Sequence, residues 1–406
     1  MPAGLPLTFR KRRLSTREPP RKKTVWSLRS RAVRGWLYQA LALAAVAAVV
    51  AFLAHNTQVN MRERGIQSGF DFLSQSAGFD IGETMVAYDP SETYGKALWV
   101  GVLNTLRVAV IGIVLTTLVG VLMGIGRFSH NALVRGVCYA YVETFRNVPI
   151  LLQLLMWYLF FVEVLPPPQE AWNAGNLFYL SKGGFAFPSP VWAPGHAWMA
   201  LGALVGLVAG VGYRRWAQRE FERTGQDRNR WALPLAAVVL GAGLGWAAGG
   251  APREWSVPEQ LAFMVDGGIS ATPEFLAVLI GLTLYTGAFV AEVVRGGIQS
   301  VSHGQTEAAS ALGLSPRQRM RLVVLPQAMR VIIPPLTNQY LNLTKNSSLA
   351  VAIGYPDVVS IANTTLNQSG RAVECIAIIM LVYLTTSLST SALMNWYNKR
   401  VAIQER

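Results

Sequence analysis

Long apolar stretches with almost no charge are the feature that most constrains the fold of this chain. A helix needs about 20 apolar residues to cross a bilayer. Charged residues make up 14% of the 406 residues, whereas soluble domains contain about a quarter. We therefore predict an all-α integral membrane protein with about eight transmembrane helices. The predicted spans cover residues 35–55, 98–126, 139–163, 195–213, 231–249, 273–297, 331–353 and 374–397.

No motif for enzyme chemistry is found in the sequence. It contains no G-x-x-x-x-G-K-[ST] phosphate loop, no H-E-x-x-H zinc motif and no G-x-S-x-G nucleophile elbow. The four histidines are scattered, and the two cysteines, Cys138 and Cys375, both fall in apolar segments. We therefore expect no catalytic residues, no metal site and no cofactor, and any ATP hydrolysis would need a separate subunit.

Positive charge is concentrated at the N-terminus. Residues 1–34 hold eleven Lys and Arg and one acid, Glu18, so they supply most of the net charge of +14. The apolar run 35–55 is too long for a signal-peptide core and lacks an A-x-A cleavage site. We predict an uncleaved first span with a basic cytoplasmic tail that contacts anionic membrane lipid. The distribution of charge does not favour a nucleic-acid partner.

The charge of the connecting segments predicts the orientation of the chain. Segments that alternate on the predicted inner side hold 26 Lys and Arg, whereas those on the outer side hold six. Because positively charged loops stay in the cytoplasm, both termini and the segment 307–326 should be cytoplasmic. The mixed segment 56–96, which contains Phe70, Phe72 and Phe79, should form a small folded part on the outer side.

The cytoplasmic segment Thr306–Pro326 predicts a helical hairpin. Thr306 is expected to cap a first helix that carries Glu307 in its first turn, and Gly313 should end it in a left-handed conformation. Ser315 should cap a second helix with Pro316 at its first position, completed by Gln318 in a capping box. A plain surface hairpin is the alternative that capping alone leaves open.

Glycines recur every fourth residue in two neighbouring spans. Gly202, Gly206 and Gly210 form one stripe, and Gly241, Gly245 and Gly249 form another. Small residues at this spacing let two helices approach closely, so the spans 195–213 and 231–249 should pack on each other. The alternative is that glycine is simply common in membrane helices. The charged stretch from Arg214 to Arg230 should be a solvated turn between them.

The seventh predicted span carries polar residues that lipid would not tolerate. Asn338, Asn342 and Lys345 lie beyond the Pro334-Pro335 break, and Glu292 lies near the inner end of the sixth span. Such groups face a protein interior or an aqueous path. We expect them to belong to a substrate route; hydrogen bonding between bundle helices is the alternative.

With these pieces in order, the chain resembles the permease subunits of ABC importers for polar amino acids, the histidine-permease type. The resemblance is carried by Asn104-Thr105-Leu106, by Glu143-Thr144-Phe145-Arg146-Asn147-Val148-Pro149, by Ala291-Glu292…Arg295-Gly296, by Glu307-Ala308-Ala309…Gly313 with Leu325-Pro326, and by Leu343-Thr344-Lys345-Asn346-Ser347-Ser348-Leu349. Val148 departs from the usual threonine.

The resemblance implies a domain organisation. Residues 97–164 and 271–400 would form the five-helix core of a type I ABC importer permease. The basic tail 1–34, the extra helix 35–55, the periplasmic segment 56–96 and the inserted loop and helical hairpin 165–270 lie outside that core. This long layout is similar to the larger permease of general L-amino acid importers.

The resemblance also implies partners and roles. Glu307, Ala308, Ala309, Gly313, Leu325 and Pro326 would couple the chain to an ABC ATPase dimer. A second homologous permease and a periplasmic amino-acid-binding protein would complete an importer in the bacterial inner membrane. Glu292, Asn338, Asn342 and Lys345 would meet the substrate, an amino acid. A secondary transporter or channel that needs no ATPase is the alternative function.

Overall fold

The computed structural model describes residues 31–63, 65, 68–226, 228–229 and 231–401. The chain divides into two units, residues 1–68 and 69–406, and each is described here by itself. Nearly all of the predicted basic tail lies outside the described residues.

The first unit contains one helix, α1 (Arg31–Glu63). It extends eight residues beyond the predicted span 35–55, so the start of the expected segment 56–96 is helical. Large apolar side chains such as Leu43 and Phe52 are about two-thirds exposed along it. A helix that is apolar on all sides suits contact with lipid chains.

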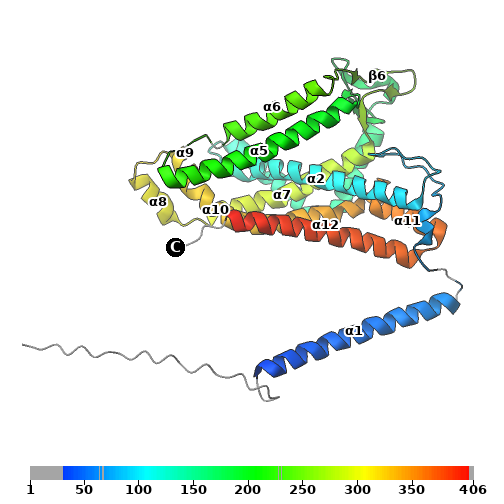
Figure 1. The fold of residues 1–406 in the computed structure, drawn as a ribbon. Helices are drawn as coiled ribbons and strands as arrows, with labels where there is room; N and C mark the ends of the chain where they lie inside the picture. Colours follow the sequence, from blue (N-terminus) through cyan, green and yellow to red (C-terminus); the bar gives the residue numbers. More distant parts are fainter. Residues whose placement is uncertain (1–30, 64, 66–67, 227, 230, 402–406) are drawn as a thin grey trace, which may run out of the picture. The chain divides into compact units, whose positions relative to one another are not determined.

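Four long helices of the second unit pack in series, α2 on α7, α7 on α10 and α10 on α12 (Figure 1). They are α2 (Tyr94–Gly126), α7 (Pro273–Gln299), α10 (Leu325–Asn346) and α12 (Ala372–Val401). Helix α7 packs against both α2 and α10, and about two-thirds of the residues in its most apolar stretch are buried. Gly120 and Gly124 of α2 face Val290 and Val294 of α7, where any side chain at either glycine would overlap them.

The predicted span 139–163 is broken in two. Helix α3 (Ala132–Asn147) ends before Pro149, and α4 (Ile150–Leu159) with a π-helical turn (Phe160–Val164) continues at an angle of 106°. The buried amide of Gln153 donates to the carbonyls of Phe145 and Val148, at 3.0 and 2.9 Å. These bonds satisfy carbonyls that the break leaves without helical partners, and so they stabilise the bend at Pro149.

The seventh span is also composite. A short helix, α9 (Pro316–Arg319), runs through a π-helical turn (Met320–Val324) into α10, which a 3-10 segment (Ser347–Ile353) extends. After Gly354 the chain turns into α11 (Val358–Ser369), bent by 52° from the preceding helical run. The segment that connects the seventh and eighth predicted spans is therefore largely helical.

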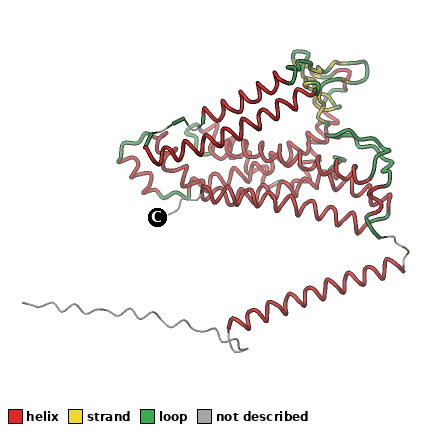
Figure 2. The backbone as a smooth tube through the Cα atoms, in the orientation of Figure 1, coloured by secondary structure: helices red, strands yellow, loops and turns green. Residues whose placement is uncertain are grey.

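Small sheets occupy the ends of the inserted region, where the sequence predicted irregular loops. One sheet has the antiparallel order β1-β2-β3-β8, and two more have two strands each (Figure 2). The strands are β1 (Trp172–Ala174), β2 (Phe178–Ser181), β3 (Gly184–Phe187), β4 (Ser189–Pro190), β5 (Trp255–Ser256), β6 (Glu259–Gln260), β7 (Val265–Asp266) and β8 (Ile269–Ala271). Pairing of Phe185 with Ala271 joins the two ends of the insertion directly before α7.

The folded part predicted within 56–96 is confirmed for its second half. A 3-10 turn (Asp71–Ser74) places Phe72 in a buried cluster with Ile81 and Tyr94. Arg371 forms an ion pair with Asp71 at 3.1 Å, and Glu374 accepts from the backbone of Gly69 at 2.7 Å. This segment is therefore held against the start of α12.

The inserted hairpin consists of α5 (Pro194–Thr224) and α6 (Ala232–Ala248), which lie side by side (Figure 1). A Cβ atom added at Gly202 would overlap the carbonyl oxygen of Gly241, and one at Gly206 would overlap that of Ala237. The predicted glycine-mediated packing is confirmed. The turn expected from Arg214 is wrong, because α5 stays helical to Thr224.

Replacing Gly206 by leucine should separate these helices, because the new side chain has no room against the backbone of α6. We expect a loss of about 1–3 kcal/mol of stability, measured as a lower unfolding temperature of the purified protein. Gly212→Leu is the matched control on the same helix, since nothing lies within 4 Å of a Cβ there. Equal effects of the two variants would contradict the close packing.

The number of spans remains a prediction. Among the described residues, five helices are long and apolar enough to cross a membrane, and two bent pairs also qualify if each counts as one span. The remaining predicted span, 231–249, is α6, which has 17 residues. That is shorter than the roughly 20 residues that cross a bilayer without tilting or thinning.

Candidate functional site

The predicted coupling hairpin lies at one end of the second unit, which we call the α8 end; the strands lie at the opposite end, the sheet end (Figure 1). Helix α8 (His303–Ala311) follows Ser302, so Thr306 does not cap it. The hydroxyl of Thr306 instead donates to the carbonyl of His303 at 2.7 Å. Glu307 accordingly lies beyond the first turn, and that part of the prediction is wrong.

The break after α8 is as predicted. Gly313 has φ of +75°, the left-handed conformation that glycine adopts without strain. Leu314 N–H donates to the carbonyl of Ala309 at 3.2 Å, and Gly313 N–H donates to that of Ser310 at 2.9 Å. This pair of bonds is a Schellman motif, which satisfies the last carbonyls of the helix.

The cap of the second helix is also as predicted. The Ser315 hydroxyl accepts from the Gln318 backbone at 3.4 Å, while the Gln318 side chain accepts from the Ser315 backbone at 3.0 Å. The Arg319 side chain donates to the hydroxyl of Ser310 at 2.8 Å, which ties the two helices together. The turn is therefore fixed on both sides by local bonds.

Most of the predicted coupling residues face outward in this chain. The exposed ones are Glu307, Ala308, Gly313, Leu325 and Pro326. Ala309 differs, because it is 3% exposed and holds α8 against its own unit. Leu312, at the turn, is 80% exposed.

A cluster of four charged residues lies where α2, α3 and α7 end at the α8 end. Glu292 forms an ion pair with Arg127 at 2.6 Å and with Arg295, and lies 3.6 Å from Arg146. The guanidinium of Arg127 also lies 4.9 Å from the ring centre of Tyr139, and Arg127 is 9% exposed. One carboxylate thus joins the ends of three helices.

The four predicted substrate residues separate into two groups. Asn338, Asn342 and Lys345 are exposed and recur at i, i+4 and i+7 on α10, so they lie on one face of that helix. Glu292 is occupied by arginines, and in the described residues no hydrogen bond or ion pair joins it to the other three. The structure therefore brings together three of the four.

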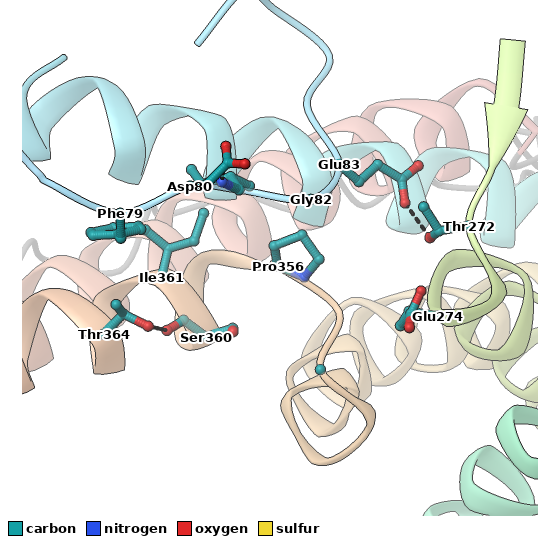
Figure 3. A pocket seen from close by; sticks show the side chains of 12 residues that line it. Phe79, Asp80, Gly82, Glu83, Thr272, Glu274, Pro356, Ser360, Ile361 and Thr364 are labelled. Carbon is teal, nitrogen blue, oxygen red and sulfur yellow. Dashed lines mark hydrogen bonds between the residues drawn. The ribbon is translucent and has the colours of Figure 1, made fainter. Parts of the chain in front are cut away.

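A pocket of about 360 Å³ lies at the sheet end (Figure 3). Its lining includes Asp80 and Glu83 before α2, Glu274 at the start of α7, and Ser360 in α11. Glu83 is buried, is ion-paired with Arg107, and accepts from the hydroxyl of Thr272 at 2.6 Å. Asp80 and Glu274 leave oxygen acceptors at the rim, which an ammonium group could use.

Sequence reasoning missed two of these arrangements. Arg146 and Arg295 are noted in the sequence as parts of motifs, and Glu292 is predicted to lie on the substrate route, so the ion pairs that join them were not predicted. No role was given to Glu83 or Arg107. The only signal in the sequence was that a carboxylate and an arginine each lie near the end of a predicted span. An unpaired charge is costly there, so each of them needs a partner.

Three relatives cover nearly the whole chain. The general L-amino acid transport system permease protein AapQ of Rhizobium johnstonii is 44% identical over 95% of this chain and 98% of its own length. YhdX of Escherichia coli (strain K12) is 47% identical over 92% of this chain and 95% of its own. The glutamate/glutamine/aspartate/asparagine transport system permease protein BztB of Rhodobacter capsulatus is 38% identical over 87% and 90%.

A family profile matches the C-terminal third. Residues 263–403 match the binding-protein-dependent transport system inner membrane component. This range contains α7, α8, α10 and α12, and with them the hairpin and the exposed polar face of α10.

Proposed function

Because this chain belongs to the permease subunits of amino-acid ABC transporters, we propose that it passes L-amino acids into the cytoplasm by alternating access. The family consists of multi-pass inner-membrane transport subunits, and the chain is not an enzyme. The observation that carries the proposal is the identity of 44% with a general L-amino acid permease over nearly the full length of both chains. ATP hydrolysis belongs to a separate subunit in this family.

The α8 end would face the cytoplasm and meet the ATPase. Supporting this, the loops at that end carry most of the arginines, and the exposed Leu312 projects beside the fixed turn at Gly313. Glu307, Ala308, Leu325 and Pro326 would border the contact, with Ala309 holding the helix from behind. The charge of the connecting segments would likewise place both termini in the cytoplasm. The domain boundaries at 97–164 and 271–400 would enclose the transport core.

A second permease would cover the polar face of α10. Asn338, Asn342 and Lys345 expose amides and an ammonium that lipid would not accommodate, so a facing subunit and an aqueous route between them would explain their exposure. A periplasmic binding protein would deliver the substrate at the sheet end, where the pocket lies. Glu292 is better suited to joining helices than to binding substrate.

The names of the relatives support a broad substrate range. AapQ is named for general L-amino acids, and BztB for glutamate, glutamine, aspartate and asparagine. All such substrates carry an α-ammonium and an α-carboxylate group. A route lined by Lys345 and two asparagines could therefore bind each of them through these shared groups. The ATPase-independent transporter or channel is disfavoured, because the relatives are ABC permeases.

Replacing Lys345 by alanine should weaken uptake of acidic and neutral amino acids alike, because the common carboxylate loses its cation. We expect an apparent affinity about 5-fold to 50-fold lower, measured as uptake by cells that carry the complete importer. Lys345→Arg should retain most of the affinity. Unchanged affinity in the alanine variants of Lys345, Asn338 and Asn342 would remove these residues from the route.

The function itself is tested by gentle purification of the tagged chain from its native membrane. We expect a phosphate-loop ATPase and a second permease to remain bound in stoichiometric amounts, and proteoliposomes of that complex to take up amino acids when ATP and the binding protein are present. Repeated recovery of the chain alone, together with uptake that needs no ATP, would overturn the assignment.

A further inference from the structure

The inserted hairpin carries a two-part surface that the transport function does not use. Two hollows adjoin where α5 continues beyond its apolar part, and they share Val211 and Arg214. One, of about 520 Å³, is lined by Arg214, Arg215 and Arg219 together with Gln218 and Glu222. The other, of about 240 Å³, is lined mainly by apolar side chains of both helices.

The first hollow has an excess of positive charge. It contains three arginines and one carboxylate, that of Glu222, which already accepts from the Gln218 side chain at 2.9 Å. In the described part of the chain, neither Arg215 nor Arg219 lies within ion-pair distance of a carboxylate. Guanidinium groups present several donors in a plane and therefore suit the oxygens of a phosphate.

The second hollow is apolar and opens beside the first. Leu207 of α5 and Leu235 and Val238 of α6 line it, and Leu235 is 66% exposed. Its mouth holds Trp231, which is 72% exposed and lies 4.3 Å below the guanidinium of Arg214. Tryptophan is enriched at the level of lipid headgroups, where one side is wet and the other apolar.

We propose that this surface binds one anionic phospholipid, with its phosphate on Arg214, Arg215 and Arg219 and an acyl chain in the groove between α5 and α6. A ligand that fills both hollows carries a negatively charged group close to a hydrocarbon chain. A phospholipid has this arrangement, and basic pockets between membrane helices bind anionic headgroups. This lipid would bind to the inserted hairpin and would not contact the transported substrate.

The test is native mass spectrometry of the intact importer titrated with phosphatidylglycerol and, separately, with phosphatidylcholine. We expect one phosphatidylglycerol to be retained more tightly than the rest. The variant Arg214→Gln/Arg215→Gln/Arg219→Gln should retain it roughly 10-fold to 100-fold more weakly. Arg135→Gln, at an exposed arginine on α3 outside both hollows, is the control for loss of one surface charge and should change nothing.

Two further arms separate a lipid site from other occupants. Leu235→Ser should weaken the binding of phosphatidylglycerol several-fold. It should leave the binding of soluble glycerol phosphate unchanged, because only the lipid uses the groove. Equal competition by glycerol phosphate and by lipid would overturn the proposal in favour of a simple anion patch. Loss of the ATPase from the triple variant, with lipid retention unchanged, would identify a protein-docking surface instead.

Discussion

The variant Gly313→Val should insert into the membrane normally and fail to transport. A β-branched residue at φ of +75° is strained by about 1–3 kcal/mol. Nothing lies within 4 Å of a Cβ at this position, so the strain comes from the backbone alone and not from a clash. Relief of that strain would change the orientation of α8 relative to α9. Because α8 would then no longer fit the ATPase, ATP-driven uptake should fall roughly tenfold or more.

The measurement is amino-acid uptake alongside the amount of permease in the membrane and the ATPase activity of the purified complex. Gly313→Asn is the matched control, because asparagine tolerates the left-handed conformation, and it should keep most of the activity. Normal uptake by the valine variant would contradict the proposal that this hairpin couples the chain to the ATPase. Loss of the protein from the membrane would instead show that the turn is needed for folding.

The second large effect is expected at Glu292. Glu292→Gln removes the only carboxylate within reach of three arginines in the described structure, and leaves their repulsion at the ends of α2, α3 and α7. Breaking a buried ion pair on one side costs about 3–5 kcal/mol, and the 27% exposure of Glu292 reduces this to about 2–3 kcal/mol. The solubilised protein should unfold at a clearly lower temperature.

A double variant distinguishes this role from a substrate contact. Glu292→Gln/Arg127→Gln removes the most buried arginine along with the carboxylate and should recover part of the lost stability. Glu307→Gln, at a side chain that is 76% exposed, is the control and should leave the unfolding temperature unchanged. A stable Glu292→Gln protein with weakened substrate affinity would return Glu292 to the substrate route.

Periodic and local patterns predicted much of this molecule. The hydrogen bonds that fix the turn at Gly313, Ser315 and Gln318 join residues no more than five positions apart in the sequence. Their conformations could therefore be predicted from neighbouring residues. The same holds for the glycine stripes of α5 and α6, because helical spacing fixes which residues share a face. The misplaced cap at Thr306 is the counterexample: several polar residues could begin that helix, and only the folded chain selects Ser302.

Arrangements between distant residues could not be predicted in this way. The pairing of β3 with β8 joins segments more than 80 residues apart, on either side of the hairpin. The pocket at the sheet end needs Glu83, Glu274 and Ser360 to converge from three segments. Neither arrangement leaves a repeating signal along the chain, because each element contributes only one or two residues.

Hydropathy and local backbone conformation act over a few neighbouring residues, so a helical membrane protein with a fixed break at Gly313 could be read from the amino-acid order. The contacts of Glu292 with the ends of three helices, and the exposed face of α10 with Asn338, Asn342 and Lys345, appear only in the folded chain. Ion pairing and burial depend on which distant segments pack together, and the free energy of the whole fold selects that packing.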